Sequence, residues 1–344
     1  MSVKKDYIPF GESKPCFIVA EAGSNHNCDI RIAFSLIDSA KDAGADAIKF
    51  QIFKADLLYS KKTPYFKMYK KAPYNLIKDI EMPRGWLPRL KEYADKLGII
   101  FFATPFDNEA VDLLNEIGVV LYKIASFEIV DLELIEYVAG KGKPILISTG
   151  LANMSEIEDA VNTAKNAGLS YDKICLLQCA SLYPAKAEIM NLRSMETMKK
   201  AFGVNVGLSD HTLGIHISLA GVAMGARVIE KHFTLDRGMS GPDHPFAIEP
   251  EELKLLVHQV RDIEKAMGDG LKKGPSTDEM ENYEKARRSI HARVKIPKGT
   301  VITRDMLIVK RPGYGIKPKF INIVIGRKSK IDIEEDVWLN WDMI

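Results

Sequence analysis

The stretch VNVGLSDHTLGIHISLAGVAMGARVIEKHFT, residues 204–234, indicates the fold of this chain. It opens with an apolar run of β-type residues that ends at Ser209, Asp210 and His211, and a helical pattern follows directly. A second apolar run closes the stretch and carries His232 near its end. Strand, helix and strand in this order form the repeating unit of a parallel sheet, so both histidines are expected at the ends of adjacent strands.

The same alternation of short apolar runs and amphipathic helical patterns extends from residue 17 to about residue 268. The runs are apolar nearly throughout, which is typical of parallel strands buried on both faces. Helical patterns at 30–44, 86–98 and 154–168 each end in a glycine, which favours a left-handed C-cap. Strands are predicted at 17–23, 46–53, 99–106, 121–126, 144–150, 174–181, 204–210 and 227–234.

Eight βα units within roughly 250 residues are typical of a closed (β/α)₈ TIM barrel. The competing architecture is an open, doubly wound parallel sheet. Its dinucleotide-binding version carries a GxGxxG turn after the first strand, and no such turn follows residues 17–23. We therefore predict the α/β class, with a TIM-barrel catalytic domain over residues 1–270.

Two segments depart from this rhythm. Residues 54–85 separate the second predicted strand from its helix, and in barrels a connection this long often lies over the active site. A polar, charged linker is predicted at 271–288, and short β-type pieces follow it over 289–344. This last segment is expected to form a small β-rich domain, within the lower size range of independent domains.

The composition of the 344 residues excludes several classes of protein. With 46% hydrophobic residues and a net charge of +2, the chain is an ordinary globular protein with no field to attract nucleic acid or an anionic membrane. No apolar run is long enough to cross a bilayer or to form a signal peptide. Cys175 and Cys179 would lie roughly 13 Å apart on one strand, too far to bond. A reducing cytoplasm is the expected location, and the basic stretch at 61–71 is expected to be a solvated loop.

Polar side chains gather where the predicted strands end, which is where barrels build their active sites. Lys49 and Lys123 lie on buried strands, and a buried ammonium group is costly unless an anion pairs with it. The two lysines and neighbouring hydroxyl groups would form a cationic bowl suited to a phosphate or phosphate–carboxylate ligand. Those hydroxyl groups belong to Thr104, Ser126, Ser148 and Ser209.

The histidines of the opening stretch suit a metal ion. His211 and His232 would bind one divalent ion through neutral rings, with waters and substrate oxygens in the other positions. Such an arrangement is an open Lewis-acid site. His26 and His244 lie in polar loops and are candidate substrate contacts.

Eight motifs stand in order along the chain: AEAGSNHN (20–27), AGADAIKFQIF (43–53), FFATPFD (101–107), YKIASFE (122–128), ILISTGLA (145–152), GLSDHTLG (207–214), IEKHFTLD (229–236) and GPDH (241–244). Together they resemble the motifs of the sialic acid synthase family. Residues 296–315, IPKGTVITRDMLIVKRPGYG, are similar to the antifreeze-like (SAF) domain of those enzymes. The likeness covers nearly the whole chain.

The resemblance implies a transferase that condenses phosphoenolpyruvate with the open-chain form of an N-acyl-hexosamine, giving a nine-carbon 2-keto acid and phosphate. A Mn²⁺ or Mg²⁺ ion on His211 and His232 would polarise the sugar aldehyde for attack by C3 of phosphoenolpyruvate. Water would add at C2, and C–O cleavage would release phosphate. Glu21 is the implied catalytic group for the proton of the metal-bound water or of a sugar hydroxyl. Phosphoenolpyruvate would be held by Lys49, Thr104, Lys123, Ser126, Ser148 and Ser209.

On the sugar side, the resemblance implies contacts from the barrel and from a second subunit. Members of the family are domain-swapped dimers, so a homodimer is expected in which the SAF domain covers the partner's barrel. Arg311 would then reach the N-acyl group of the sugar; the alternative is that the SAF domain only stabilises the dimer. The implied barrel contacts are Gln51, Phe106, Glu128, Tyr183 and Asp243.

The motifs do not decide which of two branches of the family supplies the acceptor sugar. Phe127 stands where neuraminate synthases usually have glycine, and this version of the motif looks like pseudaminate synthases. Ser181 stands where some neuraminate enzymes have asparagine, whereas residues 214–244 look like the neuraminate and legionaminate branch. N-acetylmannosamine is therefore the first-choice acceptor, which would make the chain an N-acetylneuraminate synthase. A 2,4-diacetamido-trideoxyhexose, the acceptor of a legionaminate or pseudaminate synthase, is the second.

Two other classes of function compete with this interpretation. A metal-dependent barrel aldolase or lyase would act on pyruvate or a sugar phosphate, and its Schiff-base version would need Lys49 or Lys123 to be essential. A non-catalytic sugar-binding protein would keep its ligand affinity without His211 and His232. The presence of both histidines, both lysines and Glu21 favours the synthase over the binding protein.

Overall fold

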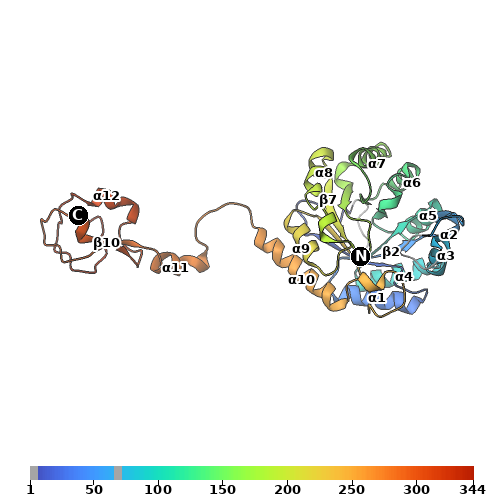
Figure 1. The fold of residues 1–344 in the computed structure, drawn as a ribbon, viewed down its shortest axis with the longest axis horizontal. Coiled ribbons are helices and arrows are strands. Elements are labelled where there is room, and N and C mark those ends of the chain that lie inside the picture. The colour runs from blue at the N-terminus through green and yellow to red at the C-terminus, as the bar shows by residue number, and fades with distance from the viewer. Residues whose placement is uncertain (1–6, 66–71) are drawn as a thin grey trace. The chain divides into compact units, whose positions relative to one another are not determined.

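The computed structural model describes residues 7–65 and 72–344 of the chain (Figure 1). These residues divide into two compact units, with the boundary between Gly268 and Asp269. Part of the basic stretch expected to be a solvated loop, residues 66–71, lies outside the described residues.

The first unit is built on eight parallel strands. They are ordered β3-β2-β1-β8-β7-β6-β5-β4, and the two strands at the ends of this order are in contact, so the sheet curls into a nearly closed barrel. The predicted TIM barrel is confirmed, because an open sheet would keep its end strands apart. The strands are β1 (Phe17–Gly23), β2 (Ala47–Ile52), β3 (Ile100–Pro105), β4 (Tyr122–Ile124), β5 (Ile145–Ser148), β6 (Ile174–Gln178), β7 (Asn205–Asp210) and β8 (Val228–His232).

Helices surround the strands, as Figure 1 shows. Their ends carry local signals: Asn153 and Glu156 form a capping box at the start of α7, and Gly98 ends α4 in the left-handed conformation at φ 70°. The expected glycines after α1 and α7, Gly44 and Gly168, also have positive φ. The helices of this unit are α1 (Ile30–Asp42), α2 (Ala55–Leu58), α3 (Pro73–Asp79), α4 (Leu87–Leu97), α5 (Asn108–Glu116), α6 (Leu132–Ala139), α7 (Met154–Asn166), α8 (Ser194–Phe202), α9 (His216–Ala223) and α10 (Pro250–Met267).

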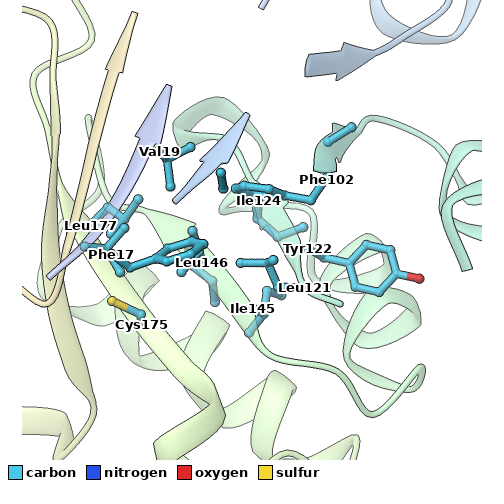
Figure 2. Close-up of a cluster of buried hydrophobic side chains, with 14 of the residues drawn as sticks. Phe17, Val19, Phe102, Leu121, Tyr122, Ile124, Ile145, Leu146, Cys175 and Leu177 are labelled. Atoms are coloured by element: carbon cyan, nitrogen blue, oxygen red, sulfur yellow. The ribbon is translucent and has the colours of Figure 1, made fainter. Parts of the chain in front are cut away.

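Apolar side chains fill part of the barrel interior (Figure 2). Successive side chains of a strand point to opposite faces, so Phe17 and Val19 lie on the same face of β1 as Glu21. Cys175 belongs to this buried cluster, and it and Cys179 are free thiols, as expected. None of the described helices is long and apolar enough to cross a membrane.

The long connection between β2 and α4 contains helices α2 and α3 in its described parts. These two helices contact each other, and Arg84 near the end of the connection forms ion pairs with Asp107 and Glu109 at the start of α5. The end of the connection is thereby tied to the loop that follows β3.

The second unit is small and has its own core. Strands β9 (Ser289–Ala292) and β10 (Leu307–Lys310) pair antiparallel, with two short helices, α11 (Met280–Lys285) and α12 (Ile321–Val324). The core is aliphatic and comprises Ile290, Ala292, Ile296, Ile302, Leu307, Ile316, Val324, Ile333, Leu339 and Ile344.

Candidate functional site

The register of the sheet places the first site residues at one level of the barrel. Glu21 on β1 is aligned with Lys49 on β2 and with His232 on β8. On the next pair of strands, Ser209 of β7 is aligned with Glu230 of β8. Aligned residues of neighbouring strands lie side by side, so backbone pairing alone assembles a carboxylate, an ammonium and an imidazole at the mouth.

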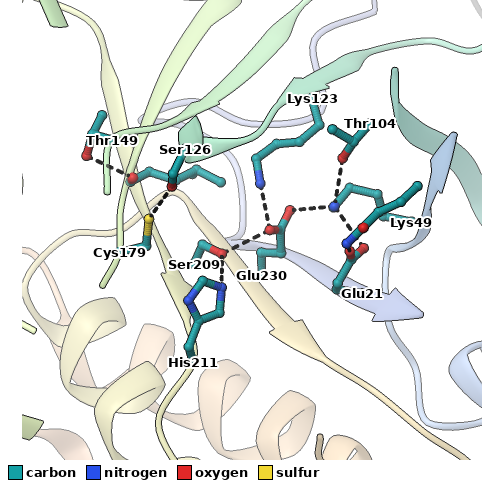
Figure 3. A network of polar contacts seen from close by, with 12 residues as sticks. Glu21, Lys49, Thr104, Lys123, Ser126, Thr149, Cys179, Ser209, His211 and Glu230 are labelled. Carbon is teal, nitrogen blue, oxygen red and sulfur yellow. Dashed lines mark hydrogen bonds and ion pairs between the residues drawn. The ribbon is translucent and has the colours of Figure 1, made fainter. Parts of the chain in front are cut away.

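A network of buried ion pairs follows from this alignment (Figure 3). Lys49 Nζ lies 2.8 Å from Glu21 Oε2 and 3.6 Å from Glu230 Oε2, and Lys123 Nζ lies 2.6 Å from Glu230 Oε1. Lys49 also donates a hydrogen bond to the Thr104 hydroxyl at 3.0 Å. These side chains are at most a few per cent exposed, so the charges interact in a medium of low dielectric.

The two carboxylates of the network differ in their affinity for a proton. Burial raises the pKa of Glu21, and the repulsion of Glu230 adds to this effect against the attraction of Lys49. Burial would also raise the pKa of Glu230, but Lys123 and Lys49 outweigh it and hold that pKa below its usual range. Glu230 is therefore the fixed negative charge, and Glu21 is the group able to take up or give a proton.

The predicted bowl is not simply cationic. Two buried carboxylates, Glu21 and Glu230, already compensate Lys49 and Lys123. The sequence reasoning recognised that the lysines need anions but assigned that role to a ligand and missed Glu230. The signal was present, since Glu230 precedes His232 by two positions on a buried strand and so shares its face.

Hydroxyl groups line the other side of the network. Ser209 donates to Glu230 Oε1 at 2.9 Å, and the Ser126 hydroxyl lies 3.0 Å from Cys179 Sγ. Only glycine fits at position 150, because an added Cβ would lie 2.4 Å from the Ser181 hydroxyl and 2.9 Å from that of Ser126. The predicted anion-binding residues Lys49, Thr104, Lys123, Ser126, Ser148 and Ser209 are all buried in the barrel unit.

His211 and His232 lie together, with ring centroids 5.4 Å apart. His211 Nδ1 is 2.7 Å from the carbonyl oxygen of Ala180, which fixes a proton on Nδ1, so that Nε2, 3.3 Å from the Ser209 hydroxyl, is the nitrogen with a lone pair for a metal. His232 Nδ1 is buried without a hydrogen-bond partner. Burial lowers the pKa of His211 to about 4 and that of His232 well below its usual value, so both rings are neutral ligands at pH 7.

The two histidines therefore fit the divalent ion expected from the sequence. Within residues 7–65 and 72–344, no group of three or more histidine, cysteine or acidic side chains is arranged to hold a metal. A metal held by His211 and His232 alone would have further positions for water or substrate.

A second buried network fixes the chain around His211. Asp210 Oδ1 accepts hydrogen bonds from the backbone and hydroxyl of Thr212, while Oδ2 accepts from Ser218 and from Lys231 at 2.9 Å. Lys231 also donates to the Thr212 carbonyl. Both neighbours of His211 are held in this way, from the face of the sheet that packs on α9. This cluster was not predicted from the sequence.

Next to the histidines lies a cavity of about 1230 Å³. His232 lines it, together with residues of α2 and α3. The barrel residues predicted for the sugar side line this cavity: Gln51, Phe106, Glu128, Tyr183 and Asp243. Burial raises the pKa of Glu128 and that of Asp243 to about 7.

Other predicted residues lie outside this cavity. Arg311 is an exposed residue of the second unit, and its predicted contact with the sugar of a partner's barrel stays a prediction. His244 is buried with Nδ1 2.6 Å from the Thr234 hydroxyl and Nε2 3.1 Å from Asn27 Oδ1, so the protein occupies both nitrogens. His26 is buried against Trp86 and Phe50. The predicted substrate contacts of His26 and His244 stay predictions.

Comparison with known proteins gives consistent matches along the chain. Residues 36–272 match the NeuB family, and residues 287–344 match the SAF domain. N,N'-diacetyllegionaminic acid synthase of Campylobacter jejuni is 45% identical over 94% of this chain and 98% of its own length. N-acetylneuraminate-9-phosphate synthase of Homo sapiens is 37% identical over 95% and 92%. The crystal structure of N-acetylneuraminic acid (sialic acid) synthetase from Leptospira borgpetersenii superimposes with a TM-score of 0.73 at 40% identity, covering 80% of this chain and 92% of that one.

Proposed function

The chain belongs to the NeuB family, and on that premise we propose that it condenses phosphoenolpyruvate with an open-chain N-acyl-hexosamine to form a nonulosonic acid and phosphate. Relatives that are named as N-acetylneuraminate-9-phosphate and N,N'-diacetyllegionaminic acid synthases support this reaction class. The observation that carries the proposal is the buried Lys49–Glu21–Glu230–Lys123 network, which adjoins both the histidine pair and the large cavity.

The network suits the ionised groups of phosphoenolpyruvate. Lys49 and Lys123 supply ammonium groups to the carboxylate and phosphate, and Ser126, Ser148 and Ser209 supply hydroxyl donors. Because Glu230 shares its charge between both lysines, their ammonium groups are held in place before substrate arrives. Such preorganised donors stabilise developing charge without reorganising during the reaction.

In the proposed reaction, C3 of phosphoenolpyruvate forms a bond to the aldehyde carbon of the acceptor. Water then adds at C2, the bond from C2 to the phosphate oxygen breaks, and inorganic phosphate leaves. Glu21 holds or releases the proton that water loses, a role that its raised pKa supports. A Mn²⁺ or Mg²⁺ ion held by His211 and His232 would supply Lewis-acid polarisation of the acceptor carbonyl.

The test is phosphate release by the metal-stripped protein with phosphoenolpyruvate and added Mn²⁺, with N-acetylmannosamine and a 2,4-diacetamido-2,4,6-trideoxyhexose as acceptors. Release is expected to require both the metal and an acceptor, and to fall about 1000-fold or more in His211→Ala, because a Lewis acid contributes several kcal/mol. His258→Ala, whose side chain is 72% exposed, is the matched control and should be fully active.

Two results would contradict the proposed reaction. One is phosphate release that is equally fast without an acceptor. The other is borohydride trapping of pyruvate on Lys49 or Lys123, which would instead indicate a Schiff-base aldolase.

The assembly belongs to the same proposal. The protein is proposed to act as a cytoplasmic homodimer in which Arg311 contacts the N-acyl group in the partner's barrel. Light scattering measures the mass, and Arg311→Ala should raise the acceptor KM while leaving the KM of phosphoenolpyruvate unchanged.

A further inference from the structure

Lys231 is a buried charge that the proposed reaction does not use. It lies between Glu230 and His232 on β8, and because successive side chains of a strand point to opposite faces, it points away from the barrel interior. Its side chain is 1% exposed, and its ammonium group contacts Asp210 Oδ2 at 2.9 Å and donates to the carbonyl oxygen of Thr212. A buried ion pair gains little over an apolar pair of the same shape, so stability alone does not account for it.

The ion pair directly precedes both histidines of the proposed metal site. Asp210 comes immediately before His211, and Lys231 comes immediately before His232. Asp210 and Lys231 are also aligned with each other, at the last paired position of β7 and β8. The ion pair therefore joins the two strands on the outer face of the sheet, at the level where the two histidines follow on the inner face.

The carboxylate of Asp210 uses its full accepting capacity to hold this junction. Its Oδ1 accepts hydrogen bonds from the backbone N–H of Thr212 at 2.9 Å and from the Thr212 hydroxyl at 2.8 Å. Its Oδ2 accepts from the Ser218 hydroxyl at 2.6 Å and from Lys231. A carboxylate has about four acceptor sites, so four donors fill them. The residues on both sides of His211 are thereby tied to β8 and to α9.

One glycine lets α9 approach β7 closely enough to complete this network. Gly221 lies three residues after Ser218, on the same face of α9. A Cβ added to Gly221 would lie 2.9 Å from Leu208 Cδ2, inside the normal contact distance. Leu208 shares its face of β7 with Asp210. The close approach of the helix at Gly221 thus brings the Ser218 hydroxyl within hydrogen-bond distance of Asp210.

The two histidine rings are held unequally. His211 is bonded through Nδ1 to the carbonyl oxygen of Ala180, and its backbone carbonyl accepts from the N–H of Ala185 at 2.9 Å. Nδ1 of His232 has no hydrogen-bond partner among the described residues. The position of His232 therefore depends on the backbone of β8, where Lys231 is its neighbour. The separation of the two rings depends in turn on how firmly this end of β8 is fixed to β7.

Resting on the proposed function, we infer that the Asp210–Lys231 ion pair positions the two histidines for the metal. From the outer face of the sheet it sets the separation of His211 and His232, and thereby the affinity of the histidine pair for a divalent ion. Neither Asp210 nor Lys231 lines the large cavity. Ligands that are already in place lose less free energy to ordering when they bind, and outer partners of metal ligands typically contribute about 10–100-fold to metal affinity.

The test measures Mn²⁺ binding by the metal-stripped protein in the absence of substrates, from the electron paramagnetic resonance signal of free Mn²⁺. The double variant Asp210→Asn/Lys231→Met removes both charges together, so that neither is left buried without a partner. Its amide oxygen can still accept from Thr212. The double variant is expected to bind Mn²⁺ about 10–100-fold more weakly than the native protein.

A milder pair of variants separates positioning from folding. Thr212→Val removes only the hydroxyl that donates to Asp210 and should weaken Mn²⁺ binding about 2–10-fold, whereas Thr212→Ser keeps that hydroxyl and should bind as the native protein does. Should the double variant fail to fold, these two variants decide alone.

The matched control is Asp46→Asn, at the opposite end of the barrel. Asp46 directly precedes β2, and its Oδ2 accepts from the backbone N–H of Ile18 at 2.8 Å and pairs with Arg261 at 2.9 Å. This variant should lose stability to urea without any change in Mn²⁺ affinity, because its contacts lie far from the histidines.

Three outcomes would contradict the inference. Native Mn²⁺ affinity in Thr212→Val and in the folded double variant would overturn it and leave the metal site standing. An equal loss of affinity in Asp46→Asn would show that the ion pair acts only through general stability. Equal Mn²⁺ affinity in the native protein and in His211→Ala would refute the proposed metal site itself, and the inference with it.

Discussion

The same strands build two regions of the barrel interior, one packed with apolar side chains and one with charged and hydroxyl side chains. Lower in the barrel, Phe17, Leu146 and Leu177 pack in an apolar cluster (Figure 2). Two positions beyond Leu146, on the same face of β5, lies Ser148, the last residue of that strand, whereas the polar network of Figure 3 joins the charged side chains of β1, β2, β4 and β8. Each strand thus contributes stability with its first inward residues and chemistry with its last.

The two regions also differ in what they contribute to folding. Burying an apolar side chain stabilises the fold by roughly 1.5–3 kcal/mol. A buried ion pair gains little over an apolar pair, because desolvation offsets most of its attraction. Four buried charges at the mouth therefore do not explain stability, and their presence is consistent with a role in binding charged substrate.

The largest effect is expected from breaking the polar region. Glu230→Gln leaves Lys49 and Lys123 buried with one carboxylate between them, and should destabilise the fold by about 3–5 kcal/mol. Urea unfolding measures this difference. Glu196→Gln removes the carboxylate of an exposed pair with Lys200 and should leave the free energy of unfolding nearly unchanged. Equal costs for the two variants would show that burial does not set the strength of this network.

Within the apolar region, Leu146→Ala creates a cavity beneath the site. Leu146 is fully buried, so the variant should lose about 2–5 kcal/mol of unfolding free energy. Because the aliphatic side chain of Leu146 offers phosphoenolpyruvate neither a charge nor a hydrogen bond, the KM of phosphoenolpyruvate should stay within about twofold of its original value. A large rise in that KM would show that packing in the apolar region controls how the polar region binds substrate.

Two positions further along the same strand, the expected pattern is reversed. Ser148→Ala removes a proposed hydrogen bond to an ionised substrate, worth about 1.5–3 kcal/mol, which corresponds to a 10–150-fold loss in kcat/KM. Its unfolding free energy should change by less than about 1 kcal/mol. If the free energy of unfolding fell and kcat/KM did not change, Ser148 would be a packing residue of the apolar region.

The smallest effect concerns Glu128, on the edge of the polar region. Burial raises its pKa from 4.5 to about 7, so the folded state holds the proton more tightly than the unfolded chain does. The stability from that proton is fully present below pH 4.5 and is lost as the pH rises to about 7. Glu128→Gln lacks this titration. Its free energy of unfolding, relative to that of the native protein, should therefore rise by about 1–2 kcal/mol from pH 4.5 to pH 8, a value discounted for the partial exposure of the side chain. Urea unfolding at pH 4.5 and pH 8 measures this difference. If it is the same at both pH values, Glu128 is an ordinary carboxylate.

Much of the fold could be predicted because its signals are local. Apolar runs and helical periodicity identified the eight strands, and the glycines that end α1, α4 and α7 adopt the expected backbone. The ends of strands were less predictable. Ser126, expected in a strand, lies in a 3₁₀ turn after the three-residue β4, since loop packing rather than propensity decides where a strand stops.

The sequence by itself determined which polar residues follow the strands, because a two-residue period and an apolar run are properties of neighbouring positions. Only the tertiary structure decided their partners. Lys123 and Glu230 are 107 residues apart and meet because β4 and β8 face each other inside one barrel. The cavity likewise depends on how α2 and α3 pack against each other. Long-range pairing depends on sheet closure and register, and these arise from the packing of the whole chain and not from any one segment.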